Sequence, residues 1–377
     1  MRGGTSRAPV FHRRDLPLSR ADWDPIFLAA IGSPDPNGRQ LDGLGGGISS
    51  LSKIVVVGPP SRADADVDYT FGQVLVGEPV VDYSGNCGNM SSAVGPFAVD
   101  EGLVAPSGSR ATVRIHNTNT NKMIVAEFPL RAGRADVEGD YELLGVAGRG
   151  ARIRLEFLEP GGAVTGRLLP TGLARQALPV AGLGSIEVSL VDATNPCVFL
   201  AAAALGLAGT ELPEAIERDR ALLNKIEAIR AAAAVAMGIA KTPEAASRSS
   251  QANPKIVLVA PPADATTLSG TFVSAGAMDL TVRMLSMGRP HRAVALTAAM
   301  CTAVAARVEG TVVHGVARPP SASGADVRLG HPSGTIDLAA RVQGGADPIA
   351  ESVVVYRTAR RLMEGSILIP GSRVRNA

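Results

Sequence analysis

Cys87 stands in a setting that could let a thiol exchange protons with a ligand. It lies in Gly85-Asn86-Cys87-Gly88-Asn89, directly before a run of small residues typical of a helix. The first N–H groups of a helix lack partners and favour negative charge, so they would bind a carboxylate and favour a neighbouring thiolate. The alternative is a plain capping turn with a buried thiol.

Lys53 is the second residue that could carry a proton. It follows Ser49, Ser50 and Ser52 and begins an apolar run that predicts a buried strand. At such a place a lysine can simply end the strand and extend to water. In a cleft, desolvation would favour the neutral amine and allow proton transfer near neutral pH.

Composition excludes several other classes of protein. Of 377 residues, 46% are hydrophobic and only 3% aromatic, which predicts a globular protein whose core is mostly aliphatic. The net charge is +2 without a basic block, so neither nucleic acid nor a membrane surface is expected as a partner. The start lacks the apolar segment of a signal peptide, and the most apolar stretch is too short to span a membrane, so we expect a cytoplasmic protein.

The spacing of the cysteines and histidines predicts no metal site. The three cysteines are far apart without CxxC spacing, and the five histidines form no HxH or HxxxH pair. Cys197 lies in an apolar run and Cys301 within a predicted helix, so both are expected in the core. The GLGGG segment lacks the lysine of a phosphate loop and the context of a dinucleotide site.

An internal repeat gives the domain organisation. The segment 50–60 (SLSKIVVVGPP) resembles 251–262 (QANPKIVLVAPP), and 113–128 parallels 327–342. Gly85 follows Lys53 by 32 residues, and Met287 follows Lys255 by the same number. We therefore predict two similar halves, residues 1–183 and 184–377, divided at the Gly/Pro-rich stretch 179–184. Helices are expected over 20–31, 90–101, 212–237 and 292–308, and a ligand site in the cleft between the halves.

The two halves differ where the thiol lies. With the offset of 202 residues, Arg289 takes the place of Cys87, which disfavours a racemase with two thiols. The turn His331-Pro-Ser-Gly334 is either a hairpin turn or a backbone nest for a carboxylate. Asp66 and Asp68 alternate on a strand and are expected to face solvent.

Seven motifs together carry a family resemblance. MRGGTS, GSPDPNGRQLDGLGG, SSLSK, DVDYTFGQV, GNCGN, SMG and GHPSGT occur in this order between Met1 and about Gly371. They resemble the PrpF family, which contains 2-methylaconitate cis-trans isomerases, 4-oxalomesaconate tautomerases and methylitaconate isomerases. The resemblance implies an α+β fold like that of diaminopimelate epimerase, in which each of two pseudo-symmetric halves wraps a helix in a curved, mostly antiparallel sheet.

The resemblance also implies residue roles. The catalytic residues would be Lys53 and Cys87, acting without cofactor or metal. The substrate-binding residues would be Ser6, Ser52, Asn86, Gly88, Asn89, Met90, Ser286, Met287, Gly288, His331, Ser333 and Gly334. Two departures, GGTSRA in place of the usual GGTSKG and the unusual MGRPHRA, put the specific substrate in doubt.

The expected reaction moves a proton on a small unsaturated di- or tricarboxylate, with Lys53 as the main base and Cys87 as its partner acid. Whether this produces a cis-trans isomerisation, an allylic shift or a tautomerisation is left open, as is a homodimer. Two alternatives remain, an amino-acid epimerase of the same fold and a non-catalytic polycarboxylate-binding accessory protein to a dehydratase.

Overall fold

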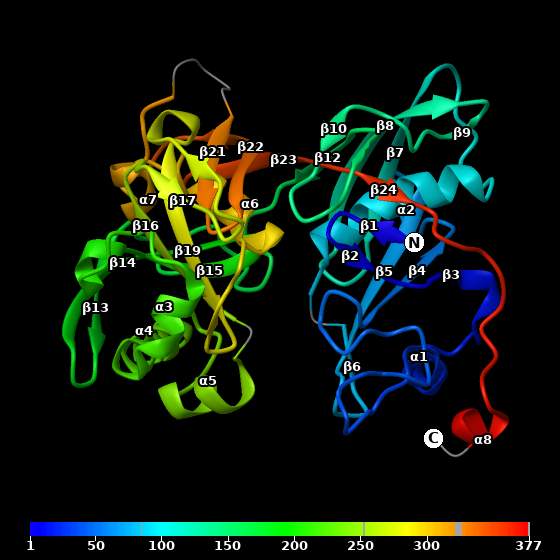
Figure 1. Ribbon diagram of the computed structural model, residues 1–377, viewed down its shortest axis with the longest axis horizontal. Helices are drawn as coiled ribbons and strands as arrows, with labels where there is room; N and C mark the ends of the chain where they lie inside the picture. The colour runs from blue at the N-terminus through cyan, green and yellow to red at the C-terminus, as the bar shows by residue number, and fades with distance from the viewer. Residues whose placement is uncertain (84, 252, 321–325, 376–377) are drawn as a thin grey trace. The chain divides into compact units, whose positions relative to one another are not determined.

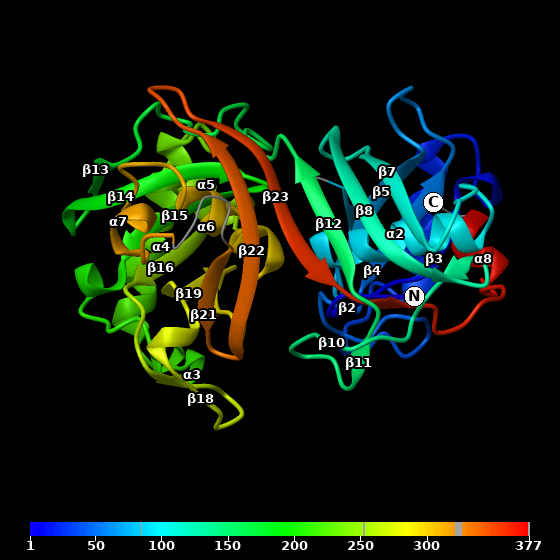
Figure 2. The same cartoon turned by 90° about the horizontal axis from the view of Figure 1, so that it is seen from above.

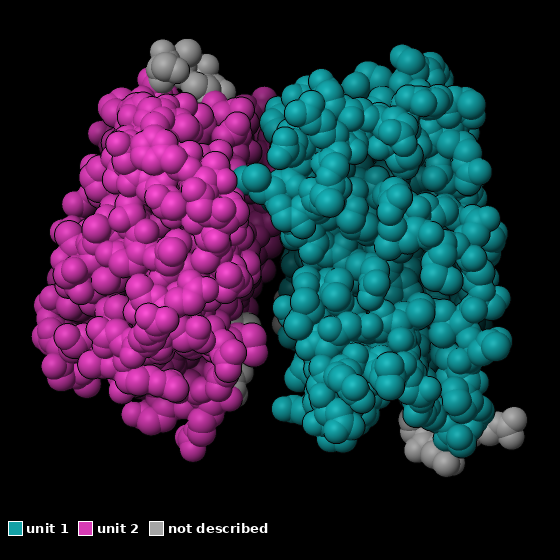
Figure 3. Space-filling view, viewed as in Figure 1, with its two compact units in different colours: residues 1–156, 356–377 teal, residues 157–355 magenta. Residues whose placement is uncertain are grey.

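The chain forms two compact units, coloured teal and magenta in Figure 3. The computed structural model describes residues 1–83, 85–251, 253–320 and 326–375. The first unit comprises residues 1–156 and 356–377, and the second comprises residues 157–355. Strands β12 (Ile153–Leu158) and β23 (Ile349–Arg357) carry the chain from one unit to the other.

The first unit encloses helix α2 (Gly88–Asp100) in a mixed sheet (Figure 1). Its main strands are β3 (Val10–His12), β4 (Lys53–Gly58), β5 (Val67–Val74), β7 (Arg110–Asn117) and β8 (Lys122–Arg131). Neighbours along this order pair parallel, antiparallel, parallel and antiparallel, and β8 also pairs with β12. Residues 90–99 of α2 are all buried, as expected for a helix with strands around it.

A second helix of this unit, α1 (Trp23–Ile31), covers the other face of β4. Ile54 and Val56 pack against Trp23 and Phe27 of α1. Because side chains alternate along a strand, Lys53 lies on the opposite face of β4, the face turned toward α2.

The remaining elements of this unit are short. They are β1 (Arg2–Gly3), β2 (Ser6–Arg7), β6 (Val81–Asp82), β9 (Arg134–Ala135), β10 (Tyr141–Glu142), β11 (Arg149–Gly150), β24 (Ala359–Arg360), α8 (Gly371–Arg375) and the 3-10 turns Arg13–Asp15 and Arg20–Asp22.

The second unit repeats the arrangement around helix α6 (Leu296–Ala305), which contacts β14 (Gly184–Ala193), β15 and β22 (Figure 2). Its main strands are β15 (Asn195–Ala201), β16 (Lys255–Ala260), β19 (Leu280–Ser286), β21 (Val327–His331) and β22 (Gly334–Gln343). They pair in the same parallel, antiparallel, parallel, antiparallel order as in the first unit, and β22 continues to β23. The predicted pseudo-symmetric α+β fold is therefore confirmed.

The other elements of the second unit are further strands, helices and short turns. They are β13 (Gln176–Val180), β14 (Gly184–Ala193), α3 (Pro213–Arg218), α4 (Arg220–Ala236), α5 (Pro243–Ser249), β17 (Ala265–Thr266), β18 (Phe272–Val273), β20 (Arg289–Pro290), α7 (Val312–Val316) and the 3-10 turns Ala202–Leu205 and Ala275–Ala277.

One ion pair shows the repeat at the level of side chains. Asp66 and Arg114 pair at 2.8 Å in the first unit, and Asp279 and Arg328 pair at 2.6 Å in the second. In both cases the arginine's own backbone N–H also donates to the aspartate. Arg114 and Arg328 are the second residues of the matched segments 113–128 and 327–342, so this part of the sequence alignment is correct.

The structure differs from the sequence-based expectations at three places. The helix expected over 212–237 forms two helices, α3 and α4, with Asp219 between them. The Gly/Pro-rich stretch 179–184 is the hairpin turn between β13 and β14, so the chain passes between units at 156/157 instead. The helix expected over 292–308 begins only at Leu296, because Arg289–Pro290 pairs as β20 and the N–H of His291 donates to the Met284 carbonyl.

Arg230 on α4 organises the segment that leads into β16. Its guanidinium is only 2% exposed and forms two hydrogen bonds of 2.7 Å to the carboxylate of Glu227. It also donates to the carbonyl oxygens of Ala246, Ser250 and Asn253. One buried cation thereby connects α4 to the residues just before Lys255.

We predict that Arg230→Met lowers the free energy of unfolding of the second unit by about 3 kcal/mol, because the partners of a buried charge are left unpaired. Hydrogen exchange over residues 246–257 should rise, and urea denaturation gives the free energy. Lys225→Met, at an exposed position of the same helix, is the control and should change stability by less than about 0.5 kcal/mol. Equal effects of the two substitutions would contradict the role of Arg230.

Candidate active site

Lys53 does not extend to water. Its side chain is buried, and Nζ donates a hydrogen bond of 2.5 Å to Oε1 of Gln73, its cross-strand partner on β5. The ammonium also lies 5.1 Å from the centroid of the Phe71 ring. The sheet face toward α2 therefore holds the lysine in one orientation.

Gln73 is itself fixed by the backbone. Its Nε2 donates to the carbonyl oxygens of Ser49 and Ser52, at 3.1 and 2.8 Å. These two bonds determine which end of the amide is the acceptor, so Oε1 is presented to Lys53. The serine-rich segment before the lysine thus orients the glutamine that holds the amine.

Cys87 is the N-cap residue of α2 and is half-buried. Its carbonyl oxygen accepts the first helical hydrogen bond from Ser91 N–H, and also bonds from Ser91 Oγ and Tyr69 Oη at 3.1 and 3.4 Å. Among the residues that the structure describes, no side chain caps the N-terminus of this helix, so the N–H groups of its first turn are available to a ligand. Burial, and secondarily the Cys87 thiol, raises the pKa of Tyr69 well above its usual value.

Two asparagines beside the thiol are held by distant parts of the chain. Asn86 Oδ1 accepts hydrogen bonds from Asn117 Nδ2 at 3.3 Å and from Ser91 Oγ at 3.4 Å. Asn89 Nδ2 donates to Thr5 Oγ1 at 3.2 Å. The predicted binding residues Asn86, Gly88 and Asn89 therefore lie together at the start of α2.

The MRGGTS motif brings the N-terminus against α2. A Cβ added at Gly3 would lie 2.8 Å from the Asn89 carbonyl oxygen, and one added at Gly4 would overlap Asn89 Oδ1. Gly4 also has a φ of +52°, which favours glycine. Both glycines are needed for Thr5 and the buried Ser6 to reach the helix start.

Two predicted binding residues of this unit have structural roles in the described chain. Ser52 is fully buried, and its Oγ lies 2.7 Å from Gln40 Oε1 and 2.8 Å from the Ile48 carbonyl oxygen. Gln40 Oε1 also accepts the N–H groups of Gly46 and Gly47. Met90 is fully buried in the core, so only its backbone N–H is turned toward the helix start.

The predicted residues of the second unit form two separate hairpin turns. Met287 and Gly288, both with positive φ, connect Ser286 of β19 to β20. His331 and Gly334 face each other across the turn between β21 and β22. Gly330, next to His331, pairs with Thr281 near the beginning of β19. Ser286, at the other end of β19, lies about 17 Å from Thr281 along the strand, so the two turns are apart. Ser333 Oγ donates to the Arg292 carbonyl and fixes the loop before α6.

The counterpart of Cys87 must be corrected. Cys87 is the N-cap of α2, five residues after β6, and Ala295 is the N-cap of α6, five residues after β20. Arg289 belongs to β20 and instead matches Val81. The constant offset failed because the connection from β16 to β19 is much longer than that from β4 to β5, and the shorter β19–β20 turn only partly offsets the difference. The second unit therefore presents a methyl group where the first presents a thiol.

Cys197 and Cys301 lie in the core of the second unit, as expected. Both are fully buried, and burial raises the pKa of the Cys301 thiol. Cys197 is the strand neighbour of Lys255, the counterpart of Lys53. Burial lowers the pKa of Lys255, whose Nζ lies 3.5 Å from Asn195 Oδ1.

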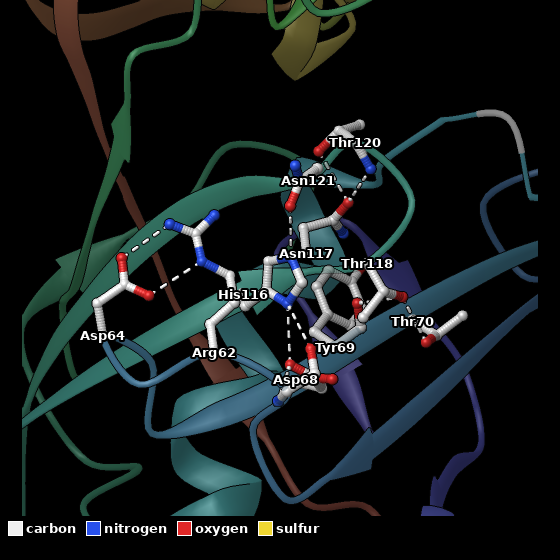
Figure 4. A network of polar contacts seen from close by, with 11 residues as sticks. Arg62, Asp64, Asp68, Tyr69, Thr70, His116, Asn117, Thr118, Thr120 and Asn121 are labelled. Atoms are coloured by element: carbon white, nitrogen blue, oxygen red, sulfur yellow. Dashed lines mark hydrogen bonds and ion pairs between the residues drawn. The ribbon is translucent and has the colours of Figure 1, made fainter.

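His116 on β7 is the centre of a polar network that no sequence motif predicted (Figure 4). His116 Nδ1 lies 2.9 Å from Asp68 Oδ1 and 3.3 Å from Ser61 Oγ, while Nε2 lies 3.0 Å from Asn121 Oδ1. Asp68 is thus paired, and Asp66 is paired with Arg114, so the expectation that both simply face solvent was wrong. A catalytic triad needs serine and aspartate on opposite ring nitrogens, so this network is not one.

No group of three or more metal-ligating side chains occurs within residues 1–83, 85–251, 253–320 and 326–375. In the same ranges, none of the helices is both long enough and apolar enough to cross a membrane.

Several proteins of known name are similar in sequence to this chain along nearly its whole length. A 2-methyl-aconitate isomerase of Shewanella oneidensis is 42% identical over 98% of this chain and 96% of its own length. A 3-methylitaconate isomerase of Eubacterium barkeri is 41% identical, over 99% and 97%. A 4-oxalomesaconate tautomerase of Pseudomonas putida is 37% identical, over 98% and 94%.

Solved structures of other proteins are similar to this chain in fold. The crystal structure of a methylitaconate-delta-isomerase matches with a TM-score of 0.89 and 40% identity, covering 100% of this chain and 96% of that one. A probable proline racemase from Agrobacterium radiobacter, with a TM-score of 0.50 and 12% identity over 93% and 84%, shares the fold alone. The chain is thus a two-unit protein of the racemase and epimerase fold. The model of the PrpF protein family matches residues 1–370, and the chain belongs to that family.

The close approach of Gly4 to α2 gives a direct test of the site's construction. We predict that Gly4→Ala displaces Asn89 and lowers both thermal stability and any ligand binding at the start of α2. Gly38→Ala is the matched control, because Gly38 also has positive φ (+68°) but an added Cβ would meet no atom within 4 Å. The control should show only backbone strain of about 1–2 kcal/mol. Equal melting temperatures and equal binding for the two variants would contradict this account.

Proposed function

We propose that the protein is a cofactor-independent isomerase of a small unsaturated di- or tricarboxylate, such as 2-methylaconitate or oxalomesaconate. Lys53 is the main base and Cys87 its partner acid. The names of the relatives support the substrate class. The arrangement of the two side chains within one unit supports the chemistry.

One structural observation carries the proposal: Lys53 and Cys87 adjoin the same row of side chains. Tyr69, Phe71 and Gln73 alternate on β5 and therefore share the sheet face toward α2. Gln73 binds the amine at one end of this row, and Tyr69 contacts the Cys87 carbonyl at the other. Both proton carriers thus belong to one compact unit, Lys53 on this face of the sheet and Cys87 at the start of the helix that the face contacts.

The chemistry follows from this placement. A base removes a proton from a carbon that is adjacent or vinylogous to a carboxylate, and the C–H electron pair is delocalised onto that carboxylate as a dienolate. The unpaired N–H groups of α2 stabilise the developing negative charge. The proton is returned to another carbon, or to the same carbon after rotation about the loosened bond. No electrons leave the substrate, so the step requires no redox cofactor.

Other contacts belong to the same proposal. Asn86, Gly88, Asn89 and the N–H of Met90 bind substrate from the start of α2, while Ser6 lies on β2 beside it. From the second unit we propose the turns Ser286–Gly288 and His331–Gly334 as further contacts. A cytoplasmic location fits this metabolic chemistry.

The epimerase alternative is disfavoured by the side chain at the N-cap of α6. Two-base racemisation with thiols requires a second cysteine, and that position is Ala295. The accessory-protein alternative differs in one measurable respect, because a protein that only binds a polycarboxylate does not exchange its carbon-bound protons.

The deciding experiment incubates the protein with a panel of unsaturated di- and tricarboxylates in D₂O and follows them by NMR. An isomerase incorporates deuterium at a defined carbon and accumulates a new isomer. Ligand binding without exchange across the whole panel would favour the accessory protein.

We predict that Lys53→Met abolishes turnover while ligand affinity is largely retained, because the N–H groups of α2 remain. Cys87→Ser should lose roughly 10²–10⁴-fold in rate, the usual contribution of one acid–base group. Cys197→Ser and Cys301→Ser are the matched controls, since both thiols are buried in the second unit, and they should lower melting temperature more than rate. Near-full activity of Lys53→Met would mean that another residue takes the proton.

A further inference from the structure

Arg357 is a buried cation near the Cys87 thiol. No motif in the sequence pointed to it. It is the last residue of β23, and its side chain is only 5% exposed. Nε donates to Asn89 Oδ1 at 3.1 Å, on the second residue of α2, and Nη1 donates to the carbonyl oxygen of Tyr356 at 2.7 Å. The guanidinium therefore lies at the start of the helix that Cys87 caps.

No carboxylate neutralises this guanidinium within the described residues. Arg357 forms no ion pair there, and the ionisable groups that face it are Tyr141 and Cys87. The comparably buried Arg230, in contrast, has the carboxylate of Glu227 at 2.7 Å. The Nη2 group of Arg357 has no acceptor among the described side chains and carbonyls. One charged nitrogen is thus left for a ligand.

Leaving such a charge unpaired is costly. Removing an ion from water costs several kcal/mol, and the cost is recovered only when an opposite charge and good hydrogen bonds are supplied. Burial lowers the pKa of Arg357 to about 10, so the group is still a cation at neutral pH. The anion that compensates this charge must come from a ligand or from the thiolate form of Cys87.

The surroundings favour a ligand carboxylate. The first N–H groups of α2 belong to the same turn as Asn89, to which Arg357 donates, and no described side chain caps them. A guanidinium and helix N–H groups that converge on one point are suited to an oxygen anion that accepts several hydrogen bonds at once. Asn89 holds the guanidinium at this point through its Oδ1, which is fixed in turn by Thr5.

We propose that Arg357 and the first N–H groups of α2 bind one carboxylate of the substrate, next to Cys87. The inference rests on the proposed function and names the group that anchors the substrate. Arg357 would hold the carboxylate on which the dienolate charge develops, so its contribution grows as the proton leaves.

The test compares Arg357→Met and Arg357→Lys with Arg360→Met, an exposed arginine three residues further on. For Arg357→Met we expect KM, or the Kd of the dicarboxylate mesaconate, to rise roughly 10- to 100-fold, the range for loss of a charged hydrogen bond. Arg357→Lys should recover part of the affinity. Arg360→Met should behave as the unaltered protein does.

Melting temperature separates this role from a structural one. Because Arg357→Met removes an uncompensated buried charge and keeps similar volume, its melting temperature should stay the same or rise. A fall in melting temperature with unchanged KM and Kd would show that Arg357 only ties β23 to α2, and would overturn the proposal.

A second measurement does not depend on turnover. Mesaconate should raise the melting temperature of the unaltered protein by mass action and should fail to do so in Arg357→Met. The diamide of mesaconate, which has no carboxylate, should stabilise both proteins equally little. If mesaconate stabilises the unaltered protein but no panel compound is isomerised, the proposed function fails while Arg357 keeps its ligand. Equal stabilisation of both proteins by mesaconate, or of neither, would overturn the inference.

Discussion

The rest of the structure depends on how the N-terminal end of α2 is held. To bind a ligand, the first turn of α2 needs backbone N–H groups that no capping side chain occupies. The helix end must then be held in position by contacts other than a cap. Hydrogen bonds from neighbouring segments hold this end of α2. They come from Thr5 in the N-terminal hairpin, Asn117 at the end of β7, Tyr69 on β5 and Arg357 at the end of β23. Four segments far apart in the sequence hold the helix without covering it.

The same arrangement explains why small residues predominate at this point. Gly3 and Gly4 allow the first hairpin to touch Asn89, and the small residues of α2 let strands approach it on every side. A chain with only 3% aromatic residues can pack a helix this closely because few large rings must be accommodated. The buried rings that do occur near the site, Tyr69 and Phe71, contact Cys87 and Lys53.

Much of the fold and part of the site could be predicted from the sequence. The repeat identified the pseudo-symmetric halves because buried strands with an initial lysine recur with turn residues at similar spacing. It failed at the counterpart of Cys87, because two connections before that position differ in length between the halves and a constant offset no longer aligns them. It also placed the division at 179–184, since a hairpin turn and a linker have the same Gly/Pro composition. Arg357 gave no local signal: it stands in an apolar strand, and only tertiary contact brings it to α2.

Because residues 356–377 belong to the first unit, the two units are completed at different times while the chain is synthesised. Residues 157–355 are contiguous in sequence, so all of the second unit has been made before residues 356 onward are added. Residues 1–156 are made earlier but still lack β24 and Arg357, and the pairing of Arg361 with Glu101 at 2.6 Å must wait until residues 157–355 have been made. The first unit is therefore completed only after the second, and the start of α2 acquires the positive charge of Arg357 only at that stage.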